Sequence, residues 1–222
     1  MKKSIQSLPV SRNWRMPALF PAMGIFLLLC LSNAMGQAGS KESQKFLEYG
    51  NAAKDSFIDL KTELGSTLAL YNTLLAGEAK KPESTYKKLT QAIGKSEKVV
   101  AKSNSSVEKM QKQAGKVFSE WEKELASYQN EQLKELSVQQ LDAAKKRNEA
   151  MTEKMKLAIE ASTSLVTSLN EQATFMARDL SPEAMTMLQG PAEELNGVAE
   201  EVIAQIDAVL VGELPDEAVL DD

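Results

Sequence analysis

The stretch that decides the fold is residues 141–180, which read LDAAKKRNEAMTEKMKLAIEASTSLVTSLNEQATFMARDL. Steps of three and four residues separate the members of one stripe, and such alternation is typical of a helix that buries one face against partner helices, as in a coiled coil. Asn148 and Ser162 are the polar members, and a buried polar contact at these positions is a hypothesis for what sets the helix register. The complete stripe is Leu141, Ala144, Asn148, Met151, Met155, Ala158, Ser162, Leu165, Leu169, Ala173, Met176 and Leu180.

Two further helices are predicted before this one. The first spans about 43–75, with Ser43 as N-cap, and is stopped by Gly77 and the Pro-containing stretch 78–83. The second starts near 82–85 and reaches about Tyr128, and the serines in its middle indicate close helix approach, fraying or a kink. The predicted core positions of the first helix are Phe46, Tyr49, Ala53, Phe57, Leu60, Leu64, Leu68, Tyr71 and Leu75. Those of the second are Tyr86, Leu89, Ile93, Val100, Ser103, Val107, Met110, Ala114, Val117, Trp121, Leu125 and Tyr128.

A turn is predicted over 129–137, and the third helix then continues to about Asp179. The fourth helix opens with Ser181 as N-cap and Pro182 at its first position, and Gly190-Pro191 should kink or break it. Its predicted core is Ala184, Met187, Leu188, Leu195, Val198, Val202, Ile206 and Val209. Because no segment alternates with period two, the sequence predicts an all-α fold, an elongated antiparallel four-helix coiled-coil bundle. The alternative is two helical hairpins that pair only by dimerisation.

The first forty residues differ in composition from the rest. A basic leader is followed by the apolar run 22–31 and then by Ala34-Met35-Gly36, a pattern typical of a secretory signal peptide over 1–36. The alternative is an uncleaved anchor, although the run is short for a membrane span. We expect a linker over 37–42, a helical domain over 43–211 and an acidic, disordered tail over 212–222. The expected location is periplasmic, or at the inner membrane if the leader is retained.

The formal net charge of the chain indicates which classes of partner it can bind. Removal of the leader subtracts four Lys and Arg from 26 and no Asp or Glu from 31, which leaves a formal net charge of −9. An acidic chain without a concentrated basic patch argues against nucleic acid and against docking on anionic lipid. A protein partner or self-association is therefore expected, with membrane contact only through an uncleaved leader.

The residue types available for chemistry are few. The sequence contains no histidine, and Cys30, its one cysteine, lies in the leader. The commonest general base, the commonest metal ligand and the Ser-His and Cys-His pairs are thus absent. We expect no enzymatic activity, no cofactor and no metal. A soft copper site built from Met151, Met155, Met185 and Met187 is the weaker alternative to core packing.

Trp121 and Tyr128 are the candidate anchor residues. They are seven residues apart near the end of the second predicted helix, so they should share one helical face. Such a pair would bind a ligand or partner, or it would belong to the buried core, which the same spacing also favours.

The segment 117–125, VFSEWEKEL, with Tyr128, Gln140-Leu141 and Leu188-Gln189-Gly190, resembles the bacterial family called domain of unknown function 2959. The resemblance covers roughly 43–211 and implies an exported, all-helical envelope protein with no assigned activity. Many members of that family look like lipoproteins, whereas Cys30 here follows Leu29 and lacks a lipobox.

Together these observations favour a structural or protein-binding role, as an adaptor or oligomer in the bacterial cell envelope. The alternative is a periplasmic carrier that holds a small ligand or metal in the bundle core.

Overall fold

The computed structural model describes residues 41–212, and this part of the chain is built from helices. They are α2 (Lys41–Leu75), α3 (Pro82–Leu125), α4 (Glu131–Met176), α5 (Pro182–Met187) and α6 (Gln189–Val211). No strand occurs between residues 41 and 212, so the predicted all-α class is confirmed. The predicted leader and the last ten residues of the acidic tail lie outside the described residues.

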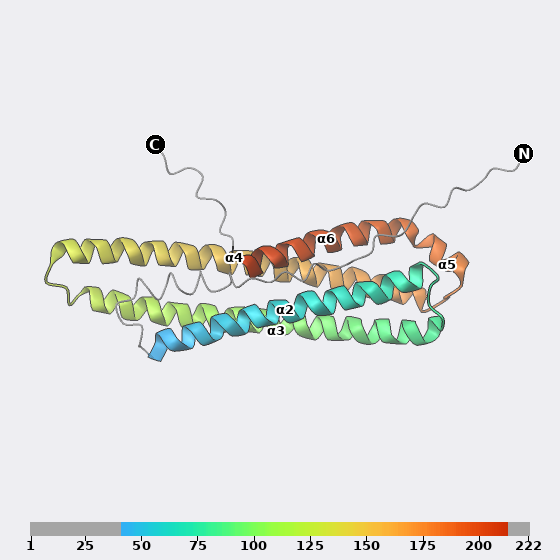
Figure 1. Ribbon diagram of the computed structural model, residues 1–222, viewed down its shortest axis with the longest axis horizontal. Coiled ribbons are helices and arrows are strands. Elements are labelled where there is room, and N and C mark those ends of the chain that lie inside the picture. The colour runs from blue at the N-terminus through green and yellow to red at the C-terminus, as the bar shows by residue number, and fades with distance from the viewer. Residues whose placement is uncertain (1–40, 213–222) are drawn as a thin grey trace, which may run out of the picture.

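The helices lie side by side along one long axis (Figure 1). α3 runs back along α2, α4 runs back along α3, and α6 packs on α4 and α2. Because α6 has 23 residues and α4 has 46, α6 covers only the later half of α4. At the opposite end, the α3–α4 hairpin extends past both α2 and α6 (Figure 1).

Local signals in the sequence explain most helix ends. α2 ends in a Schellman motif, in which Gly77 takes φ 67° and the N–H of Glu78 donates to the carbonyl of Thr73 at 3.2 Å. The side chain of Ser181 caps α5 by accepting from the N–H of Ala184, as predicted. α2 begins at Lys41 rather than at Ser43.

The predicted turn over 129–137 is wrong from residue 131 onward. Asn130 caps α4 by accepting from the N–H groups of Gln132 and Leu133, so the helix already begins at Glu131. Asparagine is a strong N-cap residue, and it sets the start of this helix. The helix also ends at Met176, before the expected Asp179.

The core follows the predicted stripes, with corrections at their edges. Met187 and Val198 were predicted to be buried but are 73% and 41% exposed. Asn148 is only partly buried, and Ser162 donates within its own helix to the carbonyl of Ala158, so neither joins two helices. Buried residues that the stripes missed include Ser56, Thr67, Leu74, Ala92, Ser96, Gln113, Phe118, Ser137, Thr152, Ile159, Val166, Met185, Ala192 and Ala199.

The serine-rich middle of α3 marks close packing on α2. The hydroxyls of Thr67 and Ser96 lie 3.0 Å apart, and Ser103 donates to the backbone carbonyl of Ser56 at 3.1 Å. All four residues are fully buried. Small hydroxyl side chains let the two helices approach while satisfying their own polar groups. These contacts join α2 to α3 through buried polar groups. From the sequence, such register-setting polar contacts were expected at Asn148 and Ser162 instead.

The predicted break near Gly190-Pro191 lies at Leu188. This residue ends α5 and precedes α6, which places Pro191 in the first turn of α6. A proline there needs no intrahelical donor, whereas a continuous helix would require its missing N–H to bond the carbonyl of Met187. Pro191 therefore separates the two helices.

Candidate functional site

The free end of the α3–α4 hairpin contains a buried polar contact between the two helices. The indole N–H of Trp121 on α3 donates to Oγ of Ser137 on α4 at 2.9 Å, and both side chains are buried. Lys145 and Glu122 form an ion pair of 2.5 Å across the same two helices. Trp121 is thus a core residue that fixes one helix against the other.

Tyr128 does not share a helical face with Trp121. α3 ends at Leu125, and Tyr128 lies in the connection that leads to α4. Its side chain is half-buried and packs at the edge of the core. The structure therefore separates the two predicted anchor residues into a buried core member and a residue at the hairpin turn.

Exposed apolar side chains gather just after this turn. Leu133 is 52% exposed and Leu136 is 55% exposed, and their spacing of three places them on the same side of α4. Val138, which is 39% exposed, points to another side of the helix. Single exposed apolar residues are ordinary, but two leucines on one side of the same helix form a small apolar surface, and Tyr128 lies in the connection that precedes them. We call Tyr128, Leu133 and Leu136 the hairpin tip.

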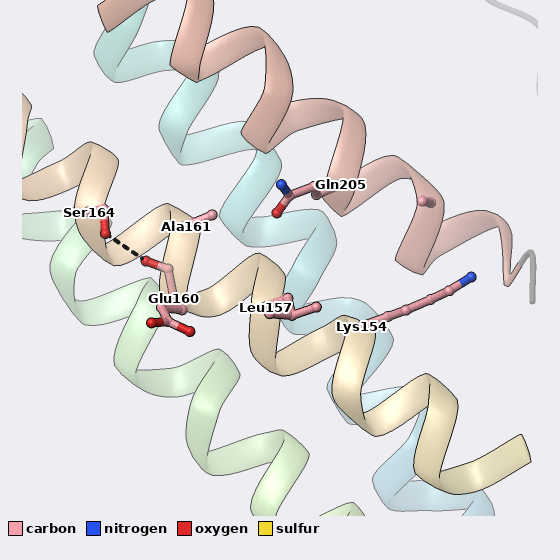
Figure 2. A pocket seen from close by; sticks show the side chains of 7 residues that line it. Lys154, Leu157, Glu160, Ala161, Ser164 and Gln205 are labelled. Atoms are coloured by element: carbon pink, nitrogen blue, oxygen red, sulfur yellow. Dashed lines mark hydrogen bonds between the residues drawn. The ribbon is translucent and has the colours of Figure 1, made fainter. Parts of the chain in front are cut away.

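A groove of about 480 Å³ lies between α4 and α6 (Figure 2). α4 contributes most of its lining, and Gln205 and Ala208 of α6 form the other wall. Leu157 is exposed inside it, and the lining is mostly apolar carbon. The α4 lining residues are Lys154, Leu157, Glu160, Ala161 and Ser164.

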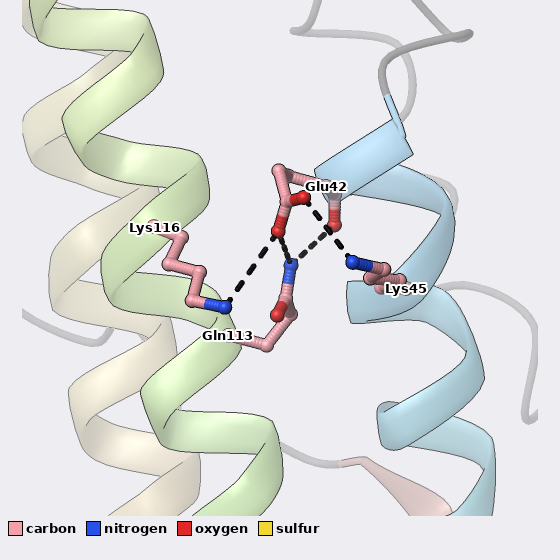
Figure 3. Close-up of polar contacts among 4 residues, drawn as sticks. All are labelled: Glu42, Lys45, Gln113 and Lys116. Carbon is pink, nitrogen blue, oxygen red and sulfur yellow. Dashed lines mark hydrogen bonds and ion pairs between the residues drawn. The ribbon is translucent and has the colours of Figure 1, made fainter.

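A polar cluster joins the start of α2 to α3 (Figure 3). The side-chain amide of Gln113 donates to Oε2 of Glu42 at 2.7 Å and to its backbone carbonyl at 3.0 Å. Lys45 lies 3.3 Å and Lys116 4.0 Å from the same carboxylate. The hydrogen bond from Gln113 lowers the pKa of Glu42 below 4.5 and outweighs the opposing effect of desolvation, and both lysines add to the lowering.

A second polar chain links α2, α4 and α6 near the other end of the molecule. The hydroxyl of the buried Tyr71 donates to Oε1 of Gln172, whose amide donates to the carbonyl of Pro191 at 3.1 Å. Burial raises the pKa of Tyr71 to about 12. Lys61 also pairs with Asp207 at 2.5 Å, so α6 is held to α2 by an ion pair as well.

The methionines of the suggested copper site do not form one group. Met151 and Met155 are buried near the middle of α4, whereas Met185 is buried in α5, beyond the far end of α4. Met187 is exposed. Among residues 41–212, no group of three or more His, Cys, Asp or Glu side chains is arranged to hold a metal ion. None of the helices described has the length and hydropathy needed to cross a membrane.

Ser137 is the site residue that sequence reasoning missed, because it was assigned to a turn. A signal was present: Ser137 lies four positions before Leu141 and continues the stripe of α4 towards its N-terminus. Leu133 and Leu136 were missed for the same reason, since residues in a turn have no helical face.

Comparison with known proteins gives one match. No curated protein and no solved structure matched the chain. The family model described as "Protein of unknown function (DUF2959)" matches residues 32–212, which include every helix described and the VFSEWEKEL segment around Trp121. The match covers most of the 222 residues, and the chain therefore belongs to the DUF2959 family.

Proposed function

We propose that this protein is an exported helical-bundle protein of the bacterial cell envelope with a structural or protein-binding role, acting in the periplasm as an adaptor or in an oligomer. Its helices form an antiparallel four-helix coiled-coil bundle whose last helix is broken at Leu188. The signal-like leader motivates export. The long helices, which leave few loops for a catalytic site, motivate a role that is not enzymatic.

The observation that carries the binding role is the hairpin tip. Leu133 and Leu136 are both more than half exposed, at the end of the molecule where α3 and α4 extend past the other described helices. Burial of one leucine side chain contributes roughly 1.5–3 kcal/mol. Two neighbouring leucines thus supply a small apolar surface for a protein partner to bury, and tyrosine is a residue type enriched at such interfaces.

A photoreactive amino acid at Leu136 tests this role in intact cells. We expect discrete crosslinked species, either a dimer of this chain or one defined partner. The matched control is the same amino acid at Lys156, which is exposed on α4 but distant from the tip. Absence of crosslinks at Leu136, or equal crosslinking at both positions, would reject the hairpin tip as a binding surface.

Cell fractionation tests the proposed location. We expect the chain to be released with the periplasmic contents, and its N-terminus to begin near Gln37. Recovery with the membrane fraction at full length supports the retained anchor instead, and recovery with cytoplasmic proteins rejects export.

The carrier function has less support. A core cavity near the serines of α3 would favour it, but Ser96 and Ser103 are fully buried and engage Thr67 and Ser56 of α2. Their hydroxyls are thus used to join two helices.

A further inference from the structure

One side of α4 carries a continuous stripe that is distinct from its core stripe. It consists of Ala143, Arg147, Ala150, Lys154, Leu157 and Ala161, which follow each other in steps of four and three, and we call it the α4 seam. Leu157 is exposed and the other five are half-buried. The seam combines small or apolar residues with two cations and contains no carboxylate.

α6 covers the seam only at its far end. Leu157 and Ala161 line the groove together with Gln205 and Ala208 in the last turns of α6 (Figure 2). Because the amide of Gln172 reaches Pro191 at the start of α6, the two helices run in opposite directions. α6 therefore ends with Val211 pointing towards the first half of α4, where the seam continues past the last turn of α6.

The segment that follows has the complementary chemistry. Residues 213–222 read ELPDEAVLDD, with five carboxylate side chains, no cation and four apolar side chains. Gly212 ends α6 with φ 71°, the left-handed conformation that redirects a chain at a helix end. Leu214 follows two residues later in the sequence.

Length also fits. The seam from Leu157 back to Ala143 is about 21 Å long at the rise of an α-helix. Ten extended residues reach about 33 Å, which is enough to follow it. Within residues 41–212, Arg147 makes no ion pair. Glu160, the acidic residue of the groove, points its carboxylate away from α6 (Figure 2).

We propose that the C-terminal tail, residues 213–222, docks on the α4 seam, with Leu214 in the groove over Leu157 and its carboxylates beside Arg147 and Lys154. Docking covers the apolar part of the seam and continues the line of α6 along α4. The surface is thus a binding site for an acidic segment with apolar residues, and its occupant is the tail of the same chain.

A disulfide assay tests the placement. In the full chain carrying Cys30→Ser, we introduce Leu157→Cys with Leu214→Cys and follow oxidation on non-reducing gels. The control pair is Lys156→Cys with Leu214→Cys, at the same height on α4 but off the seam. We expect the Leu157 pair to form an intramolecular disulfide at least tenfold faster than the control pair.

The contribution of the Arg147 and Lys154 charges to docking is tested in the full chain that carries Cys30→Ser, Leu157→Cys and Leu214→Cys. Arg147→Glu with Lys154→Glu should slow formation of the disulfide severalfold, whereas Lys112→Glu with Lys156→Glu, the same charge change off the seam, should not. Equal rates for the Leu157 and Lys156 pairs would overturn the proposal. So would a dominant, concentration-dependent disulfide between two chains through Leu157→Cys alone, which would assign the seam to a second copy.

Discussion

The indole N–H of Trp121 and the hydroxyl of Ser137 form a buried hydrogen bond of 2.9 Å between α3 and α4. Both residues lie where these two helices extend beyond the others, so the bond fixes the hairpin that presents Leu133 and Leu136. If the acceptor is removed, water cannot hydrogen-bond the buried indole N–H unless the two helices separate.

Ser137→Ala should therefore destabilise the protein. It leaves the indole N–H without an acceptor, and we expect a loss of about 1–3 kcal/mol in the free energy of unfolding, measured by urea denaturation. Ser127→Ala is the control, because the exposed Ser127 bonds only the carbonyl of Glu124 in its own turn. A change below about 0.5 kcal/mol for Ser137→Ala, in the range of an ordinary surface substitution, would show that the bond does not stabilise the hairpin.

The Thr67–Ser96 contact predicts energetic coupling between α2 and α3. Thr67→Val leaves the buried Ser96 hydroxyl without its acceptor, whereas after Ser96→Ala the Thr67 hydroxyl still donates to the carbonyl of Glu63. Removal of both hydroxyls adds no second penalty. In a cycle of Thr67→Val, Ser96→Ala and the double variant, we expect a coupling of about 0.5–1.5 kcal/mol.

The same cycle with Thr73→Val in place of Thr67→Val is the control. Thr73 is exposed and its hydroxyl bonds Ala69 in its own helix, so its effect should add to that of Ser96→Ala. Additive energies for Thr67 and Ser96 would mean that their hydroxyls do not interact in solution.

Substitution by alanine should have opposite effects on the stability of the protein at Gly65, inside α2, and at Gly77, just after the end of α2. Gly77→Ala forces a side chain into the left-handed region at φ 67° and should cost about 1–2 kcal/mol. Gly65→Ala lies inside α2, and its new Cβ has no atom within 4 Å, so it should stabilise the protein by about 0.5–1 kcal/mol. Thermal unfolding of both variants measures the signs. A neutral or stabilising effect of Gly77→Ala would contradict the left-handed helix end at this residue.

Glu42 should titrate with a lowered pKa that depends on Gln113. Because the folded pKa lies below 4.5, the carboxylate contributes stability above pH 4.5, and this contribution is lost as the pH falls through the folded value. Gln113→Ala should move the pKa of Glu42 upward in an NMR titration. Gln111→Ala, which removes an exposed glutamine of the same helix, should leave it in place. An unchanged titration in Gln113→Ala would remove Gln113 as the cause.

Particular residues show how far the sequence alone reaches. The apolar stripes predicted α2, α3 and α4 because helical periodicity recurs over many turns, so that single exceptions do not obscure it. Ser137, Leu133 and Leu136 were missed because a helix start depends on one residue, Asn130, whose capping role is visible only with its local backbone. The α4 seam could not be predicted, since which side of α4 receives α6 depends on the packing of all the helices.

Because burial raises the pKa of Tyr71, we expect the protein to lose stability at high pH. Its pKa is about 12 in the folded protein against about 10 when unfolded, so unfolding releases a proton between these values. The stability associated with Tyr71 is complete below pH 10 and should fall by about 1.4 kcal/mol per pH unit up to pH 12. Denaturation series between pH 9 and 11.5 measure this slope.

Tyr71→Phe should remove that slope, at the cost of the hydrogen bond to Gln172 and hence of some stability at neutral pH. Tyr86→Phe, at a half-buried tyrosine near the start of α3, should keep the wild-type slope because Tyr71 is intact. If Tyr71→Phe loses stability between pH 10 and 11.5 as steeply as the wild type, the slope does not come from Tyr71. Tyr71 is then accessible to solvent, and the hydrogen bonds from Tyr71 through Gln172 to Pro191 are not formed in solution.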